Sequence, residues 1–115
     1  MISGIDLNEV VDHICKNDKE NPTTWRIRAL PSRKLAQITG TANEQNQMDR
    51  MIDLVKYGLC GWKNFKFKDK DVELELDTDG SLSPGVLDMI PFNVIVELST
   101  AILKINKLSA EEIKN

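Results

Sequence analysis

The side chains best able to do chemistry in this sequence are a single histidine and two cysteines. His13 and Cys15 stand two residues apart, so they would lie on one face of an extended strand. A thiol beside an imidazole can start nucleophilic catalysis when a third group orients the imidazole. The sequence offers no third group that we can name, and Cys60 lies far along the chain. We therefore predict that the protein has no catalytic residues and is not an enzyme.

Metal and cofactor motifs are also missing from the sequence. His13 is followed at the third and fourth positions by Lys16 and Asn17, neither of which is a usual metal ligand at helical spacing. Residues 75–80 resemble the start of a calcium loop, but Val86 occupies the twelfth position, where a carboxylate is needed. There is no glycine-rich phosphate loop. We expect no bound metal and no cofactor, and we expect both cysteines to remain thiols in a reducing compartment.

One segment mixes basic and aromatic residues in a way that could bind single-stranded nucleic acid. Lysines at 63, 66, 68 and 70 alternate with Phe65 and Phe67 just after Trp62. An acidic run, Asp69 to Glu75, overlaps and follows it, and the whole chain has a net charge of −3 with a pI near 5.1. We therefore predict a solvated hairpin face here and no nucleic-acid partner.

Length and composition predict one soluble domain over residues 1–115. The chain is 41% hydrophobic and 29% charged, which is close to the average for globular proteins. No apolar run is long enough to span a bilayer, and residues 1–10 lack the pattern of a signal peptide. These features predict a cytoplasmic protein with no membrane partner.

Residues that could carry chemistry must be positioned by a few short elements. Residues 5–30 predict an extended hairpin, with a polar loop from Lys16 to Pro22, although residues 7–14 also fit a short helix capped by Asp6. Residues 32–62 predict a helical region with a short first helix and a longer second one, which Gly58 and Gly61 end near Trp62.

The second half of the chain repeats this order of strands before helices. Residues 63–77 predict a second hairpin with one buried face. Residues 83–115 predict C-terminal helices: one opened by Ser83 and Pro84, an apolar one from Phe92 to about Asn106, and a short charged one capped by Ser109. The predicted fold class is α+β, with two hairpins packed against three or four helices and the apolar C-terminal helix at the centre.

Two apolar surfaces are candidates for binding a partner protein. The first is a stripe at helical spacing on the long second helix, and the second is part of the apolar C-terminal helix. The candidate residues are Met48, Met51, Ile52, Val55, Phe92, Val96 and Leu103. The alternative is that a chain of this size needs the same residues for its own core.

Five short segments carry a resemblance to a known class of proteins. They are Pro-Thr-Thr-Trp-Arg-Ile-Arg-Ala-Leu (22–30), Lys-Tyr-Gly-Leu-Cys-Gly-Trp-Lys-Asn-Phe (56–65), the acidic Asp-Gly turn, Leu-Asp-Met-Ile-Pro (87–91) and Leu-Ser-Ala-Glu-Glu-Ile-Lys-Asn (108–115). Together they resemble small morphogenesis proteins of tailed bacteriophages and prophages. Among these, the sequence is most similar to the tail assembly chaperones of long-tailed phages.

That resemblance implies a non-enzymatic function in the cytoplasm of the host cell. A tail assembly chaperone binds the tape measure protein and keeps its long helices soluble while tail tube subunits polymerise around it. The alternatives are a head-to-tail connector, a neck protein or another virion component, and a regulatory protein-binding module of a mobile element. A homo-oligomer is compatible with each of these functions.

Overall fold

The central sheet has three short antiparallel strands in the order β1-β2-β3. The computed structural model describes residues 1–107 and places β1 at Val11–His13, β2 at Thr24–Ile27 and β3 at Leu59–Lys63. Val11 pairs with Ile27 and His13 with Trp25, so the predicted N-terminal hairpin is confirmed. The alternative of a helix over residues 7–14 is wrong, because these residues form a turn and an edge strand.

The helical region was predicted to extend to residue 62, but its last residues form strand β3. Helix α2 (Gln47–Gly58) ends at Gly58, and the chain then continues directly as a strand. Trp62 pairs with Trp25 across β2 and β3, with ring centroids 6.2 Å apart. Gly58 ends the helix as predicted, whereas Gly61 lies inside β3 and pairs with Arg26. However, the residues between them pair with the open edge of β2 and do not form a loop.

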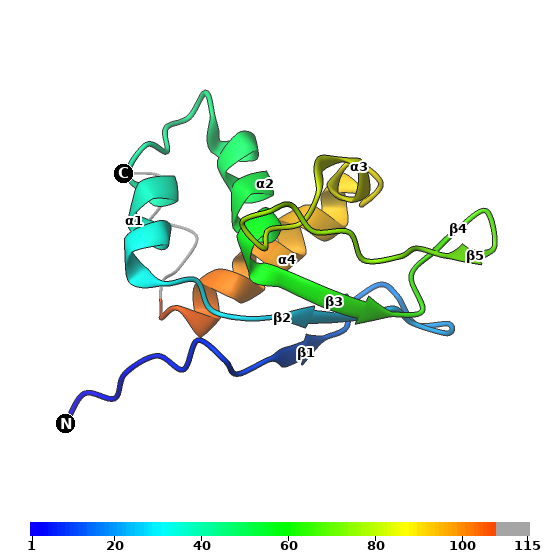
Figure 1. Ribbon diagram of the computed structural model, residues 1–115, viewed down its shortest axis with the longest axis horizontal. Helices are drawn as coiled ribbons and strands as arrows, with labels where there is room; N and C mark the ends of the chain where they lie inside the picture. Colours follow the sequence, from blue (N-terminus) through cyan, green and yellow to red (C-terminus); the bar gives the residue numbers. More distant parts are fainter. Residues whose placement is uncertain (108–115) are drawn as a thin grey trace.

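Four helices accompany the sheet in the described residues. They are α1 (Ser32–Thr39), α2, α3 (Pro84–Leu87) and α4 (Phe92–Ile105), close to the predicted positions. Figure 1 shows α4 running behind α2 and the sheet. Its buried residues Ile95, Leu98 and Ile102 recur at helical spacing and pack into the same core as Leu54 and Val55 of α2. The fold class predicted from the sequence, α+β with a central apolar helix, is confirmed.

Gly58 allows α2 and α4 to approach closely. A Cβ atom at this position would lie 2.6 Å from Cδ1 of Ile102, and 3.0 and 3.1 Å from Cγ1 and Cγ2 of the same side chain. Real Cβ atoms do not make such contacts, so the bare backbone of Gly58 is part of the packing.

The second hairpin is shorter and more exposed than predicted. It pairs β4 (Lys66–Phe67) with β5 (Lys70–Asp71), and it projects from the body of the molecule (Figure 1). Phe67, Leu74 and Leu76 are 54%, 44% and 51% exposed. The prediction of one continuous buried face is therefore wrong. The strand pairing stops at residue 71, which leaves residues 72–76 without the regular alternation that the sequence suggested.

Asn106 connects the end of α4 to the segment that follows β2 through two hydrogen bonds. Its side-chain Oδ1 accepts a hydrogen bond from the N–H of Leu30 at 3.0 Å, and its Nδ2 donates to the C=O of Leu30 at 2.7 Å. Both residues are buried, so each bond satisfies a backbone group that water cannot reach. The predicted charged helix capped by Ser109 lies outside the described residues.

Candidate functional site

Helix α4 has a second, more polar face, which is turned toward β1. This face carries the side chains Asn93, Glu97, Thr100 and Lys104, spaced three or four residues apart. Glu97 and Lys104 are the only charged residues in a helix that is otherwise almost entirely apolar. Regular helical spacing therefore aligns the charged groups of α4 along one side.

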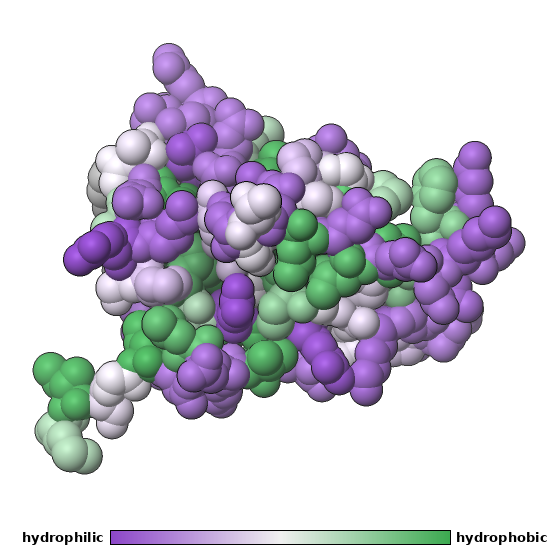
Figure 2. Space-filling model, in the orientation of Figure 1, coloured by the Kyte–Doolittle hydropathy of each residue, from purple (hydrophilic) through white to green (hydrophobic). Residues whose placement is uncertain are grey.

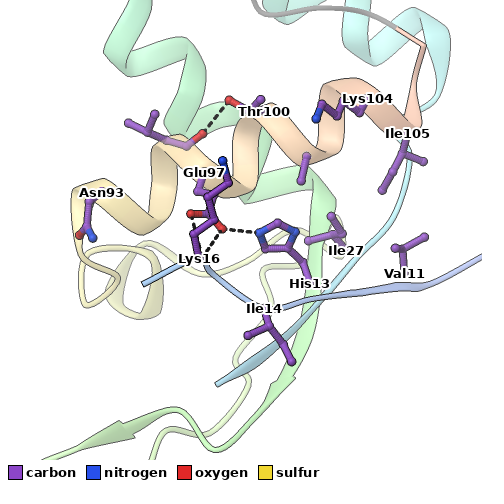
Figure 3. Close-up of a pocket in the computed structure, with 12 residues that line it drawn as sticks. Val11, His13, Ile14, Lys16, Ile27, Asn93, Glu97, Thr100, Lys104 and Ile105 are labelled. Carbon is purple, nitrogen blue, oxygen red and sulfur yellow. Dashed lines mark hydrogen bonds and ion pairs between the residues drawn. The ribbon is translucent and has the colours of Figure 1, made fainter. Parts of the chain in front are cut away.

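Glu97 contacts the end of β1 directly. Its Oε2 lies 2.6 Å from Nε2 of His13, and the backbone N–H of Lys16 donates to both carboxylate oxygens at 3.3 Å. Figure 3 shows the carboxylate and the imidazole pointing toward one another across the gap between the helix and the strand. The pair is partly buried, with side chains 26% and 30% exposed for His13 and Glu97.

Cys15 completes a cluster of three ionisable side chains. The ligand atoms of His13, Cys15 and Glu97 all lie within 4.8 Å of one another. Burial, followed by the charge of Glu97 and a hydrogen bond to it, raises the pKa of the Cys15 thiol to about 12. At neutral pH the thiol therefore stays protonated, which makes Cys15 a poor nucleophile. The structure supplies the third group that the sequence lacked, yet its negative charge suppresses the thiolate.

The pKa of the Glu97 carboxyl is shifted in the opposite direction to that of Cys15. Partial burial works to raise the pKa of Glu97, but hydrogen bonds from His13, from the N–H of Lys16 and from Cys15 outweigh it and lower that pKa below its ordinary value. Glu97 is therefore ionised throughout the neutral range. It is a fixed negative charge among three hydrogen-bond donors.

An open groove of about 530 Å³ lies between β1 and α4. Apolar side chains from both elements and from β2 form much of its lining, and polar and charged side chains surround them, as Figure 3 shows. Its apolar lining residues are Val11, Ile14, Ile27, Val96, Ala101 and Ile105, and its polar ones are His13, Lys16, Asn93, Glu97, Thr100 and Lys104. Such a lining, with a few polar groups placed among apolar ones, is typical of binding sites.

A second hollow, of about 310 Å³, opens on the other side of Glu97. Its lining includes Cys15 from the loop, Thr23 and Trp25 from the second half of the first hairpin, and Phe65. Asn93 and Glu97 line both hollows. The cluster of His13, Cys15 and Glu97 therefore stands at the boundary between two open spaces.

The predicted partner-binding residues are distributed over different environments. Val96 lines the groove, and Met48 and Phe92 are 66% and 43% exposed. Met51 and Ile52 are half-buried against the core. Val55 and Leu103 are 0% and 1% exposed, so they pack inside the protein and cannot contact a partner at its surface. For these last two residues, the alternative of a core position applies.

The basic and aromatic segment is also arranged differently from a stacking surface for bases. Phe65 packs against both Trp25 and Trp62, with ring centroids 4.9 and 5.4 Å away. The indole N–H of Trp62 donates to the C=O of Val72 at 2.9 Å. Of the three aromatic residues in the segment, only Phe67 is mostly exposed.

Sequence reasoning missed Glu97, which is the centre of the site. It is 84 residues away from His13, so no local spacing could connect them. The available signal was a carboxylate in the middle of an apolar helix, because such a residue needs a partner when the helix is packed. The groove itself depends on the packing of α4 across the sheet, which no local sequence pattern predicts.

Comparisons with protein families, with curated proteins and with solved structures found no match to this chain. The class that can be stated is therefore structural: a small α+β protein with a groove between an edge strand and its central helix. In residues 1–107, each helix is too short or too polar to cross a membrane.

Proposed function

We propose that the protein is a non-enzymatic assembly factor that binds an amphipathic helix of a partner protein in the groove between β1 and α4. The groove supports this proposal because it has an apolar lining open to solvent, and helix recognition needs such a surface for apolar anchor residues. The raised pKa of Cys15 argues in the same direction, since it disfavours covalent catalysis at the one thiol beside a histidine.

The charges around the groove indicate the chemistry of the partner. Lys16 and Lys104 are exposed at its rim, whereas the negative charge of Glu97 is engaged by His13. A helix with apolar anchors flanked by acidic residues would complement this arrangement. The segment before β1 adds further apolar surface, because Ile2 and Val10 are 98% and 48% exposed. Figure 2 shows apolar side chains projecting from this N-terminal segment.

The resemblance to tail assembly chaperones suggests which partner to test. In that role the protein would act in the host-cell cytoplasm and hold helices of a phage tape measure protein in the groove before tail tube subunits polymerise. Self-association of the chaperone is compatible with the groove being free in each copy.

Co-expression with a tape measure protein encoded in the same genome tests this proposal. The tagged protein should capture the tape measure protein and increase its soluble fraction. Ile14→Asp and Lys104→Glu should each reduce capture at least about tenfold, because one removes an apolar contact and the other reverses a rim charge. Met48→Asp and Lys66→Glu are matched controls at exposed positions outside the groove lining, and they should leave capture unchanged.

Two results would overturn the proposal. Failure of capture by the unmodified protein would reject the chaperone function, and recovery of the protein from purified virions would then support the connector alternative. Capture that Met48→Asp abolishes while Ile14→Asp preserves would place the binding surface on α2. Circular dichroism of each variant establishes that it is folded.

A further inference from the structure

His13, Cys15 and Glu97 offer three different kinds of metal ligand at one point. They supply an imidazole nitrogen, a thiol sulfur and a carboxylate oxygen, all within 4.8 Å of one another. Zn²⁺ is the common biological ion that accepts all three ligand types in one tetrahedral site. The residues come from the end of β1, the loop after it and the middle of α4, so only the folded chain brings them together.

We propose that His13, Cys15 and Glu97 form a Zn²⁺ site with a water molecule as the fourth ligand. Zinc lies about 2.0–2.3 Å from such ligands, so their atoms are about 3.3–3.8 Å apart in a tetrahedral site. The imidazole and carboxylate are now 2.6 Å apart and joined by a hydrogen bond. They must separate by about 1 Å, and the sulfur must approach by a similar amount, which side-chain rotation can supply.

The backbone around the cluster already holds the ligands in place. The N–H of Lys16 donates to both oxygens of Glu97, and zinc-bound carboxylates commonly have such an outer hydrogen bond. The loop that carries Cys15 is held by a hydrogen bond from the N–H of Asp18 to the C=O of Cys15 at 3.1 Å. Asp18 in turn accepts one from the N–H of Thr23 at 2.8 Å.

The ion can reach the cluster from solvent. His13 and Glu97 line the groove, while Cys15 and Glu97 line the second hollow. Three protein ligands beside open space leave one coordination position for water. The site therefore differs from a structural zinc site, in which four protein side chains enclose the ion.

Binding changes the bonds of the cluster in a defined way. The Cys15 thiol loses its proton to solvent and forms a Zn–S bond. Nε2 of His13 gives up the hydrogen that it donates to Glu97, so the imidazole binds zinc through Nε2 as the neutral form with its hydrogen on Nδ1. Zinc then takes the place of the hydrogen bond between His13 and Glu97. No oxidation or reduction occurs. The ion would then join β1 to α4 by metal–ligand bonds and stabilise the wall of the groove. This inference does not depend on the identity of a protein partner.

Titration of the reduced, tag-free full chain with Co²⁺ tests the site directly. Co²⁺ replaces Zn²⁺ in tetrahedral sites, and a thiolate ligand gives an intense charge-transfer absorption. We expect this absorption to saturate at one equivalent and to disappear when Zn²⁺ is added. His13→Gln and Glu97→Gln should weaken binding by about tenfold or more, because loss of even an outer-shell partner costs about 10–100-fold in affinity.

The two cysteines supply a matched control. Cys15→Ser should abolish the thiolate absorption, whereas Cys60→Ser should preserve it. Zn²⁺ should raise the melting temperature of the unmodified protein and of Cys60→Ser, but not that of His13→Gln. Absence of thiolate absorption in the unmodified protein, or its loss in Cys60→Ser with retention in Cys15→Ser, would overturn the proposal. If Cys15→Ser does not fold, His13→Gln decides the question through the same titration.

Discussion

The two faces of α4 lie in different environments, one in the core and one along the groove. One face, with Ile95, Leu98 and Ile102, is buried against the core and α2 at 2% exposure or less. The other carries Glu97, which contacts His13 of β1, and Lys104, which lines the open groove. The residues that stabilise the fold and those that line the groove are therefore on different sides of one helix. Substitutions on the two faces should therefore have very different effects on stability.

The largest effect should come from the buried face. Leu98 is fully buried, so Leu98→Ala should lower the free energy of unfolding by about 2–5 kcal/mol through lost burial and a residual cavity. Val96→Ala removes a similar side chain from the groove face and should cost about 1 kcal/mol or less. Urea unfolding of both variants measures the difference. Equal losses for the two variants would contradict the separation of the faces.

A second test removes the polar attachment at the end of α4. Asn106→Ala should lower the free energy of unfolding by about 1–3 kcal/mol, because the buried N–H and C=O of Leu30 lose their partners. Asn93→Ala is the comparison, since Asn93 is exposed on the groove side of the same helix. It should change stability by about 0.5 kcal/mol or less. A cost for Asn93→Ala as large as that for Asn106→Ala would show that the groove face also carries stability.

A third test concerns the close approach of α2 and α4 at Gly58. Gly58→Ala places a Cβ 2.6 Å from Ile102, so the helices must separate or the isoleucine must change rotamer. We expect a loss of about 1–3 kcal/mol, although alanine normally favours a helix over glycine. Gly85→Ala is the control, because a Cβ there meets no atom within 4 Å. Thermal unfolding of both variants shows whether the contact or the helix propensity dominates.

The smallest effect should be electrostatic, and it belongs to the groove face. The pKa of Glu97 is below its ordinary value of 4.5 in the folded protein. Its contribution to stability is therefore fully present above about pH 4.5 and is lost as the pH falls through the lower folded value. Glu97→Gln should cost less than about 1 kcal/mol at pH 7.

Stability measured from pH 7 down to pH 3 checks this sign. The curves of the unmodified protein and of Glu97→Gln should converge in acid, because the protonated carboxyl no longer makes its charged contacts. A constant difference at every pH would instead indicate a steric effect of the substitution.

The sequence predicted the elements whose patterns are local. The periodicities of residues 47–58 and 92–105 identified α2 and α4, and the alternation around Trp25 identified β2. Strand β3 was missed, because Gly58 and Gly61 indicate an end of helix but not the pairing that follows. β3 pairs with the free edge of β2, and this edge is available only once the chain has folded.

The candidate site was predictable in part and for a similar reason. His13 and Cys15 are close in sequence, so their common face was visible from spacing alone. Glu97 joins them through the packing of a distant helix, which no short-range pattern encodes. The helical spacing of Met51 and Val55 was correctly identified, but spacing alone could not distinguish a core stripe from an exposed one.

The contact between His13 and Glu97 also fixes an order of events when the chain is made. These residues are 84 positions apart, so at about 5–20 residues per second the histidine is synthesised about 4–17 s before its partner. During that interval β1 has no α4 to pack against, and the groove does not exist. On the ribosome, the binding surface therefore forms only after α4 has been made, and a nascent chain cannot engage a partner there until α4 has emerged.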